Sequence, residues 1–239
     1  NGTFGVKKEQ CGPVVESWDP EDEIYSTIEF FIKVREVVGK DVGIIYDLHE
    51  RFSPDQAIRI MNRLEPYDPF FIEDPIAPDC PDSLRYVREK TTVPIAFGEL
   101  YKSRWECLPA ISNHWIDYIR CDVIRIGGIT EARKIAALAE TYDIKTAWHG
   151  PNDVSPITHA VNWHLNVSEY NFGIQEDGTA DSLIKQVVSG GPSYQDGYLV
   201  MGGAPGIGCD IDEEAPARYP FRKAYIPICR QKDESLHTW

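Results

Sequence analysis

Apolar positions along the chain follow two alternating patterns, one typical of helices and one typical of buried strands. In residues 20–38 the apolar side chains recur at helical spacing, with acidic residues at the front and basic residues towards the back, and Gly39 ends the pattern. A short, mostly apolar run rich in Ile and Val follows at residues 42–46. Such a run is typical of a strand that is buried on both faces. This part of the chain therefore predicts a helix followed by a buried strand.

The same alternation continues as far as residue 175. Further helices are predicted at 54–64, 81–90, 104–111, 131–142 and 155–167, and further strands at 70–72, 93–97, 118–119, 144–148 and 172–175. The signal is sharpest at the second helix, where Ser53 can cap, Pro54 suits the first helical position and Gln56 completes a capping box. Residues 1–20 show no periodicity and are expected to form a loop.

Helices and strands that alternate in units of about 25 residues indicate an α/β protein. This period is compatible with a TIM-type (β/α) barrel, in which functional side chains lie at the carboxyl ends of the strands. The alternative, a doubly wound sheet, usually carries a glycine-rich phosphate turn after its first strand, and YDLHERF has none. Six such units do not close an eight-stranded barrel. We therefore expect an incomplete barrel, truncated at its N-terminus or completed by residues outside this chain.

The character of the sequence changes after Glu176. Residues 177–200 are mixed and loop-like, with one short edge strand predicted in GYLVM, and the stretch that follows is rich in Gly and Pro. We therefore assign residues 1–200 to the partial barrel and residues 201–239 to a segment that wraps over a surface instead of forming core.

Three acidic residues end predicted strands at equal intervals, namely Asp47, Glu73 and Glu99. A single acid in such a place is more often a helix cap or a solvated loop residue than a ligand. Three that converge at one barrel mouth would repel one another unless a hard cation neutralised them, and oxygen-only ligation favours Mg²⁺. A dication there can hold a carboxylate substrate and stabilise the enediolate that forms when its α-proton leaves. The repetition therefore predicts a magnesium site.

Other polar side chains follow the predicted strand ends and extend this site. They are His49, Arg120, His149, Asp153 and Glu176. His49 stands two residues after Asp47, on the same side of an extended chain, and beside a metal ligand it becomes a candidate acid or base. Taken singly, Arg120 could be an ion pair at the edge of the core. The histidines on helical or loop stretches are interpreted as structural, namely His114, His159 and His164.

Composition restricts the class of partner. The formal net charge is −14 and no cluster of Lys and Arg relieves it, which disfavours nucleic acid or an anionic membrane. No apolar run approaches the roughly 18 residues of a membrane-spanning helix, and NGTFGVKKEQ is not followed by the apolar core of a signal peptide. The six cysteines show no short ligand spacing and are expected to be reduced. These features predict a soluble, cytoplasmic protein.

Seven stretches of the chain together resemble a known family. They are YDLHERFSPDQA, FFIEDPIAP, IAFGELYKSRWE, DYIRCDVIRIGGIT, WHGPNDVSP, NFGIQE and GIGCDIDEEAPARYPFRKAYIP. They are similar to the mannonate dehydratase branch of the enolase superfamily, over a match that runs from about residue 15 to the C-terminus. The resemblance implies a modified TIM barrel, an N-terminal α+β capping domain on which the tail packs, and a homo-oligomer.

The resemblance also implies an activity, that of a Mg²⁺-dependent hydro-lyase that removes water from a sugar acid such as D-mannonate and yields a 2-keto-3-deoxy acid. Three residues match its metal ligands, namely Asp47, Glu73 and Glu99. His49 matches the acid that protonates the departing 3-hydroxyl group. Positions that contact the substrate are matched by Glu99, Arg120, His149, Asp153 and Glu176.

Two departures from the family pattern leave alternatives open. The family's base is a Tyr assisted by an Arg upstream of the metal-binding Asp; NGTFGVKKEQ supplies neither, so we expect this pair, the capping domain and the first strands to lie at or before Asn1. Arg125, Ile126 and His237 stand where relatives often have other residues, so D-gluconate or another sugar acid is an alternative substrate. The alternative functions are a catalytically weak or inactive homologue with a regulatory or binding role, and a purely structural truncated barrel.

Overall fold

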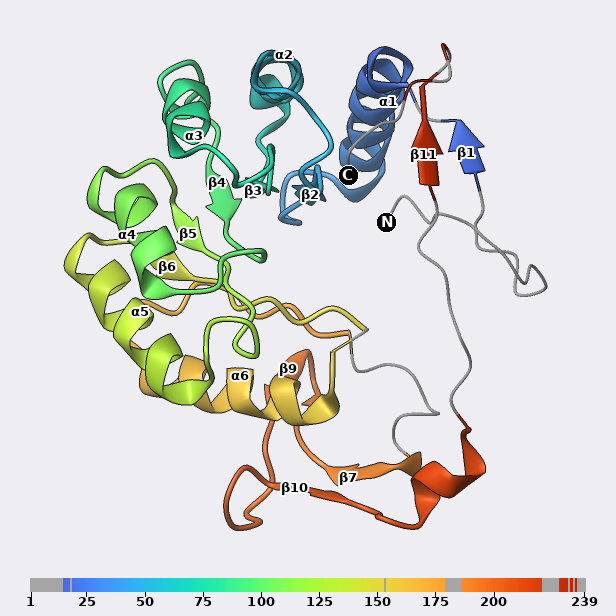
Figure 1. Ribbon diagram of the computed structural model, residues 1–239, viewed down its shortest axis with the longest axis vertical. Helices are drawn as coiled ribbons and strands as arrows, with labels where there is room; N and C mark the ends of the chain where they lie inside the picture. Colours follow the sequence, from blue (N-terminus) through green and yellow to red (C-terminus); the bar gives the residue numbers. More distant parts are fainter. Residues whose placement is uncertain are drawn as a thin grey trace. The chain divides into compact units, whose positions relative to one another are not determined.

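Helices alternate with short strands in the computed structural model, as the sequence predicts (Figure 1). The described residues are 15–17, 19–152, 154–178, 186–220, 228–231, 233 and 235. The chain divides into two compact units, residues 1–95 with 221–239 and residues 96–220.

The first unit contains the beginning of a parallel sheet and the helices that connect its strands. The described helices are α1 (Pro20–Val38), α2 (Pro54–Leu64), a 3₁₀ helix (Glu65–Tyr67) and α3 (Pro81–Arg88). The described strands are β1 (Val15–Ser17), β2 (Ile45–Asp47), β3 (Phe71–Glu73), β11 (Ile228–Arg230) and the first residue of β4 (Ile95–Phe97).

Local signals in the sequence decide where these helices begin. Asp19 caps α1 by accepting a hydrogen bond from a first-turn amide at 3.0 Å. At α2 the predicted capping box is confirmed, because the Ser53 hydroxyl accepts from the Gln56 amide and the Gln56 side chain accepts from the Ser53 amide. Each helix then turns an apolar face inward, and Phe31 on α1 and Met61 on α2 are fully buried.

Parallel pairing aligns the carboxyl ends of β2 and β3. Asp47 is the register partner of Glu73, and each is the last residue of its strand. The sheet continues towards β4 through a hydrogen bond from the Ile72 amide to the Pro94 carbonyl, at 2.9 Å.

The second unit begins within β4 and continues the same alternation. Its described helices are α4 (Arg104–Ser112), α5 (Ile129–Thr141), α6 (Pro156–Ser168) and a 3₁₀ helix (Ala215–Arg218). Its further described strands are β5 (Tyr118–Ile119), β6 (Lys145–Thr146), β7 (Val188–Gly190), β8 (Ser193–Gln195), β9 (Tyr198–Val200) and β10 (Cys209–Ile211).

The central sheet has five parallel strands in the order β2-β3-β4-β5-β6. Within the second unit Phe97 pairs with Ile119, which in turn pairs with Thr146. A helix connects each strand to the next one along the chain. This arrangement is the βα repeat of an α/β protein and is consistent with an incomplete TIM-type barrel.

Three parts of the chain differ from the prediction. Residues 15–17, expected to belong to a loop, form β1, which pairs in parallel with β11. The strand expected at 172–175 is reduced to a single bridge between Thr146 and Phe172. The loop-like region contains β7 and β8 as well as the predicted edge strand, β9. Strands of three residues are too short to establish the alternation by which strands are predicted.

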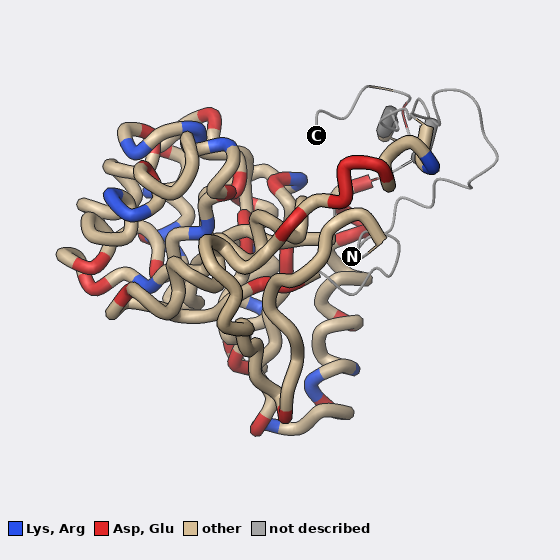
Figure 2. The backbone as a smooth tube through the Cα atoms, turned by 90° about the horizontal axis from the view of Figure 1, so that it is seen from below, with Lys and Arg blue, Asp and Glu red and all other residues tan. Residues whose placement is uncertain are grey.

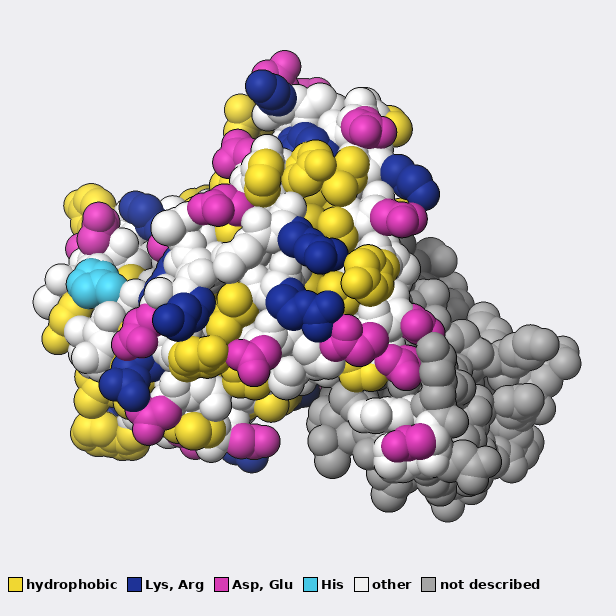
Figure 3. All heavy atoms as spheres, turned by 90° about the horizontal axis from the view of Figure 1, so that it is seen from above, with side chains coloured by type: hydrophobic (Ala, Val, Ile, Leu, Met, Phe, Trp, Pro, Cys, Tyr) yellow, Lys and Arg dark blue, Asp and Glu magenta, His cyan; other side chains and the backbone are white. Residues whose placement is uncertain are grey.

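Charges of both signs are mixed along the described part of the chain. Figure 2 shows Lys and Arg interspersed with Asp and Glu, and the face drawn in Figure 3 mixes both kinds with hydrophobic side chains.

No helix among the described residues combines the length and the apolar character needed to cross a membrane. The predicted division of the chain at residue 200 stays a prediction.

Replacing Ser53 with Ala should destabilise the fold because the capping box loses its hydroxyl acceptor. The expected loss of unfolding free energy is about 1 kcal/mol, equivalent to a fall in Tm of roughly 2–4 °C. Ser53→Asp is the matched control, since a carboxylate keeps an acceptor at the cap and should leave Tm nearly unchanged. Thermal unfolding followed by circular dichroism measures both variants, and equal losses would contradict the role assigned to the cap.

Candidate active site

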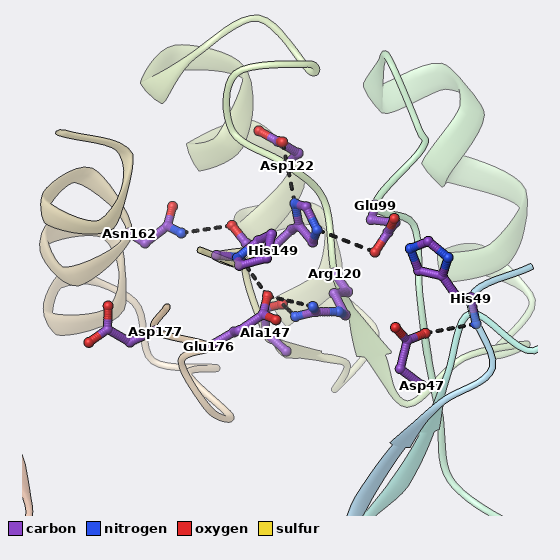
Figure 4. A network of polar contacts seen from close by, with 12 residues as sticks. Asp47, His49, Glu99, Arg120, Asp122, Ala147, His149, Asn162, Glu176 and Asp177 are labelled. Atoms are coloured by element: carbon purple, nitrogen blue, oxygen red, sulfur yellow. Dashed lines mark hydrogen bonds and ion pairs between the residues drawn. The ribbon is translucent and has the colours of Figure 1, made fainter. Parts of the chain in front are cut away.

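The first unit carries two acidic residues at the ends of neighbouring strands. Asp47 on β2 and Glu73 on β3 are register partners, so about 4.8 Å separates their strands at this level. Asp47 Oδ1 accepts a hydrogen bond from the His49 amide at 2.7 Å (Figure 4). The predicted ligand Asp47 and the predicted acid His49 are thereby held at one strand end.

The chain turns sharply after β2. His49 and Glu50 have φ angles of 53° and 57°, in a region that residues other than glycine rarely adopt. The neighbouring strand end fixes this turn, because the Leu48 amide donates to the Glu73 carbonyl and the Glu50 amide donates to the Asp74 carbonyl. Strained backbone of this kind concentrates at functional sites, and here it sets the direction in which the His49 side chain leaves the strand.

The two acids at the end of β3 are buried. Glu73 is 5% exposed and Asp74 is 1% exposed, and a carboxylate oxygen of one lies within 4.8 Å of a carboxylate oxygen of the other. Carboxylates buried so close together favour a nearby cation. Because Mg²⁺ prefers carboxylate oxygens, the donors of this unit fit the predicted ion.

In the second unit a partly buried ion pair joins Arg120, directly after β5, to Glu176. The Arg120 guanidinium donates to Glu176 Oε2 at 2.5 Å, and the Gly150 amide donates to the same oxygen at 2.6 Å (Figure 4). Gly150 has no room for a side chain, since a Cβ there would lie 2.5 Å from the Glu176 carbonyl oxygen. One carboxylate therefore ties the end of β5 to the loop after β6.

His149 lies between two carboxylates. Its Nε2 is 3.3 Å from Glu99 Oε2 and its Nδ1 is 3.3 Å from Asp122 Oδ2, while the Asn162 side chain donates to the His149 carbonyl at 3.0 Å (Figure 4). Burial alone would lower the pKa of His149, and the Arg120 charge also lowers it. The hydrogen bonds to Asp122 and Glu99 and the charge of Glu99 outweigh both effects and raise the pKa to about 9. At neutral pH both ring nitrogens therefore carry protons and can donate hydrogen bonds.

Most of the predicted site residues lie at or directly after strand ends, each within its own unit. The first unit contains Asp47, His49 and Glu73. The second brings together Glu99 with His149, and Arg120 with Glu176. Two positions of interest fall outside the described residues, namely Asp153 and His237. The roles assigned to all of them stay predictions.

The two unusual residues before GGIT differ in their surroundings. Ile126 is buried and belongs to the core. The Arg125 side chain is 45% exposed, and its Nε lies 3.7 Å from Asp122 Oδ2. Arg125 therefore adds a positive charge beside the carboxylate that contacts His149.

Sequence reasoning missed Asp122 and Asp74. Asp122 follows Arg120 by two residues, so the period of an extended chain could have placed both on one side. Burial raises the pKa of Asp122, but hydrogen bonds that include one from His149 outweigh this and lower it overall, so the carboxylate is ionised at neutral pH. Asp74 has a φ of 34°, a conformation that no pattern in the sequence indicates.

Comparison with known proteins gives a family and several relatives. The family model described as enolase C-terminal domain-like matches residues 10–215. A D-galactonate dehydratase family member from Streptomyces bingchenggensis is 38% identical over 245 residues, which cover 99% of this chain and 60% of that protein. A D-mannonate dehydratase from Sphingomonas sp. is 37% identical, covering 99% of this chain and 61% of that protein.

Solved structures agree with this assignment. An enolase from Pantoea ananatis, crystallised with D-gluconate and Mg, matches with a TM-score of 0.88 and 38% identity, over 96% of this chain and 55% of that one. An enolase from Agrobacterium radiobacter, crystallised with Na and L-malate, matches with a TM-score of 0.81 and 28% identity, over 92% of this chain and 59% of that one. The chain thus spans little more than half the length of these relatives.

Replacing Gly150 with Ala should displace Glu176, because the new Cβ collides with the Glu176 backbone. We expect a loss of unfolding free energy of about 1–3 kcal/mol, as for other overpacked sites. Gly203→Ala is the control, since a Cβ there meets nothing within 4 Å. Chemical denaturation measures both, and equal stability of the two variants would show that the contact between Gly150 and Glu176 is not close.

Proposed function

The chain belongs to the enolase C-terminal domain-like family, and on this premise we propose that the protein is a Mg²⁺-dependent hydro-lyase acting on a sugar acid of the D-mannonate or D-gluconate type. The product would be a 2-keto-3-deoxy sugar acid. The observation that carries the proposal is the pairing of Asp47 with Glu73 at neighbouring strand ends, in a chain 38% identical to an enolase crystallised with D-gluconate and Mg. Relatives named D-mannonate dehydratase support the reaction class.

We assign the metal to three carboxylates, those of Asp47, Glu73 and Glu99. Their equal spacing in the sequence, the register of the first two and the burial of the last two support this assignment. When bound, Mg²⁺ supplies positive charge that holds the substrate carboxylate and stabilises the negative charge developing as the C2 proton leaves.

We assign to His49 the role of the acid that protonates the departing hydroxyl group. Its imidazole would give a proton to the 3-hydroxyl group as the bond to carbon breaks. The hydrogen bond from the His49 amide to Asp47 and the strained turn after β2 support this role, because they fix the backbone that carries the ring. We assign no base for the C2 proton among the described residues.

We assign the orientation of the substrate to Arg120, His149 and Glu176, with Asp153 as a further contact. Arg120 and His149 carry buried N–H donors suited to the carboxylate and hydroxyl oxygens of a sugar acid. Glu176 accepts hydrogen bonds, as sugar hydroxyl groups require, and its side chain is 35% exposed. A sugar acid carries a carboxylate, which accepts hydrogen bonds, and hydroxyl groups, which both donate and accept them, so it requires both donors and an acceptor in its site.

Turnover tests the proposal directly. The full-length protein, incubated with Mg²⁺ and a panel of sugar acids, should form a 2-keto-3-deoxy product from D-mannonate or D-gluconate, detected by mass spectrometry. His49→Asn should lower kcat by about 10²–10⁴-fold, the usual contribution of a general acid. His114→Asn is the control and should keep wild-type kcat, since His114 precedes β5 and makes an edge-to-face contact with Tyr142. Absence of product across the panel would refute the dehydratase proposal.

Metal binding tests the ligand assignment separately. Glu73→Gln should weaken Mg²⁺ binding roughly tenfold or more, because it removes a charged ligand, while the exposed Glu89→Gln should change it little. Calorimetry on the full-length protein measures both, and equal affinities of the two variants would contradict the assignment. A regulatory homologue would bind Mg²⁺ without turnover, and a purely structural barrel would bind none.

A further inference from the structure

Helix α6 turns an unusually polar face inward. A helix that packs against a sheet normally presents apolar residues to it. On α6 the buried positions include four polar side chains, namely Thr158, His159, Asn162 and Asn166. Buried polar groups are costly unless they are hydrogen-bonded, so their partners show what this face supports.

His159 contacts two separate segments of the chain. Its Nδ1 lies 3.1 Å from Asp177 Oδ1, and its Nε2 lies 3.2 Å from the Pro151 carbonyl oxygen. The side chains of His159 and Asp177 are only 1% and 3% exposed. Both ring nitrogens therefore lie near oxygen atoms in a region from which water is excluded, but only the contact of Nε2 has the geometry of a hydrogen bond.

These two segments carry proposed substrate contacts. Pro151 is two residues after His149, and Asp177 directly follows Glu176. The segments also touch each other, since the Gly178 amide donates to the Gly150 carbonyl at 3.0 Å and the Gly150 amide donates to Glu176 Oε2. The place where residues 150–151 meet residues 176–178 is called the junction below. A Cβ on Gly150 would lie 3.3 Å from His159 Cε1, so the imidazole packs against this junction.

The β8–β9 hairpin contacts the junction from another side. Tyr194 on β8 has a largely exposed ring, but its hydroxyl hydrogen-bonds to the Asp177 carboxylate. Partial burial, that hydrogen bond and the charge of Asp177 together raise the pKa of Tyr194 to about 12. Asp177 is thus contacted by both α6 and the hairpin.

We propose that His159 and Asp177 are positioning residues that hold the loop bearing His149 and the segment bearing Glu176 in the relative positions that a sugar acid requires, with Tyr194 steadying Asp177. This inference rests on the proposed function for the nature of the ligand. It assigns a role to a histidine that the sequence alone indicated as structural, and to an acid in a stretch that the sequence indicated as loop-like.

Two substitutions of His159 separate its two contacts. His159→Asn keeps an N–H near the position of Nδ1 and loses the contact to Pro151, so the Gly150 amide should exchange its hydrogen about tenfold faster. His159→Gln keeps an N–H near the position of Nε2 and loses the contact to Asp177, so the Gly178 amide should exchange about tenfold faster. Hydrogen exchange resolved to single amides in the full-length protein measures both. Tyr194→Phe, a milder change at an exposed ring, should accelerate the Gly178 amide about threefold.

His164→Gln is the matched control, because His164 is on the same helix but its Nε2 contacts the Ile207 carbonyl oxygen. It should leave both amides within twofold of the wild type. If the Gly150 and Gly178 amides also stay within twofold in both His159 variants and in Tyr194→Phe, the positioning role is wrong.

Ligand binding distinguishes positioning from general support of the fold. By calorimetry, each His159 variant and Asp177→Asn should bind D-gluconate about tenfold more weakly in the presence of Mg²⁺, while the affinity for Mg²⁺ itself stays within twofold. Equal losses for both ligands would indicate general destabilisation and overturn the proposal. If the wild-type protein neither binds nor converts any sugar acid, the proposed function fails, and the two amides alone decide whether His159 positions these segments.

Discussion

Parallel pairing of short strands is the constraint on which the candidate site depends. In a parallel sheet the carboxyl ends of neighbouring strands reach the same edge, so residues that are distant in sequence meet there. Asp47 and Glu73 are register partners for this reason, and in the second unit the Arg120 amide donates to the Phe97 carbonyl at the end of β4. A register slip of one residue would turn such side chains to the opposite face and dismantle the site. The chemistry therefore depends first on backbone pairing.

Charge is the second constraint, because these strand ends are buried. In the second unit the cations Arg120 and His149 face three carboxylates, those of Glu99, Asp122 and Glu176. Removing one partner of a buried pair, such as His149 with Asp122, typically costs about 3–5 kcal/mol, since it leaves an uncompensated charge. With Arg125 beside Asp122, the cations and the carboxylates of this cluster are equal in number. The negative charge of a sugar acid would then be met by the dication that we propose.

Sequence predicted those parts of the molecule that local signals specify. The capping box of Ser53 and the strand-end acid Glu73 depend on residues a few positions away, and both lie where the pattern places them. By contrast, the pairing of β1 with β11 joins segments more than 200 residues apart, and no periodicity can reveal it. The contact between His159 and Asp177 was equally hidden, because each residue alone has an ordinary structural interpretation. The resemblance to known dehydratases supplied roles for residues, which spacing alone does not.

Metal ligands and substrate contacts are proposed on different strands, and this separation has a consequence for substrate specificity. The metal ligands are proposed at the ends of β2, β3 and β4, whereas most of the substrate contacts follow β5 and β6 or belong to the segment of Glu176. That segment is placed by contacts to Gly150 and to His159, and neither residue is a proposed ligand of the metal. Under the proposed function, substitutions around these contacts would change which sugar hydroxyl groups are accepted while the metal chemistry is retained.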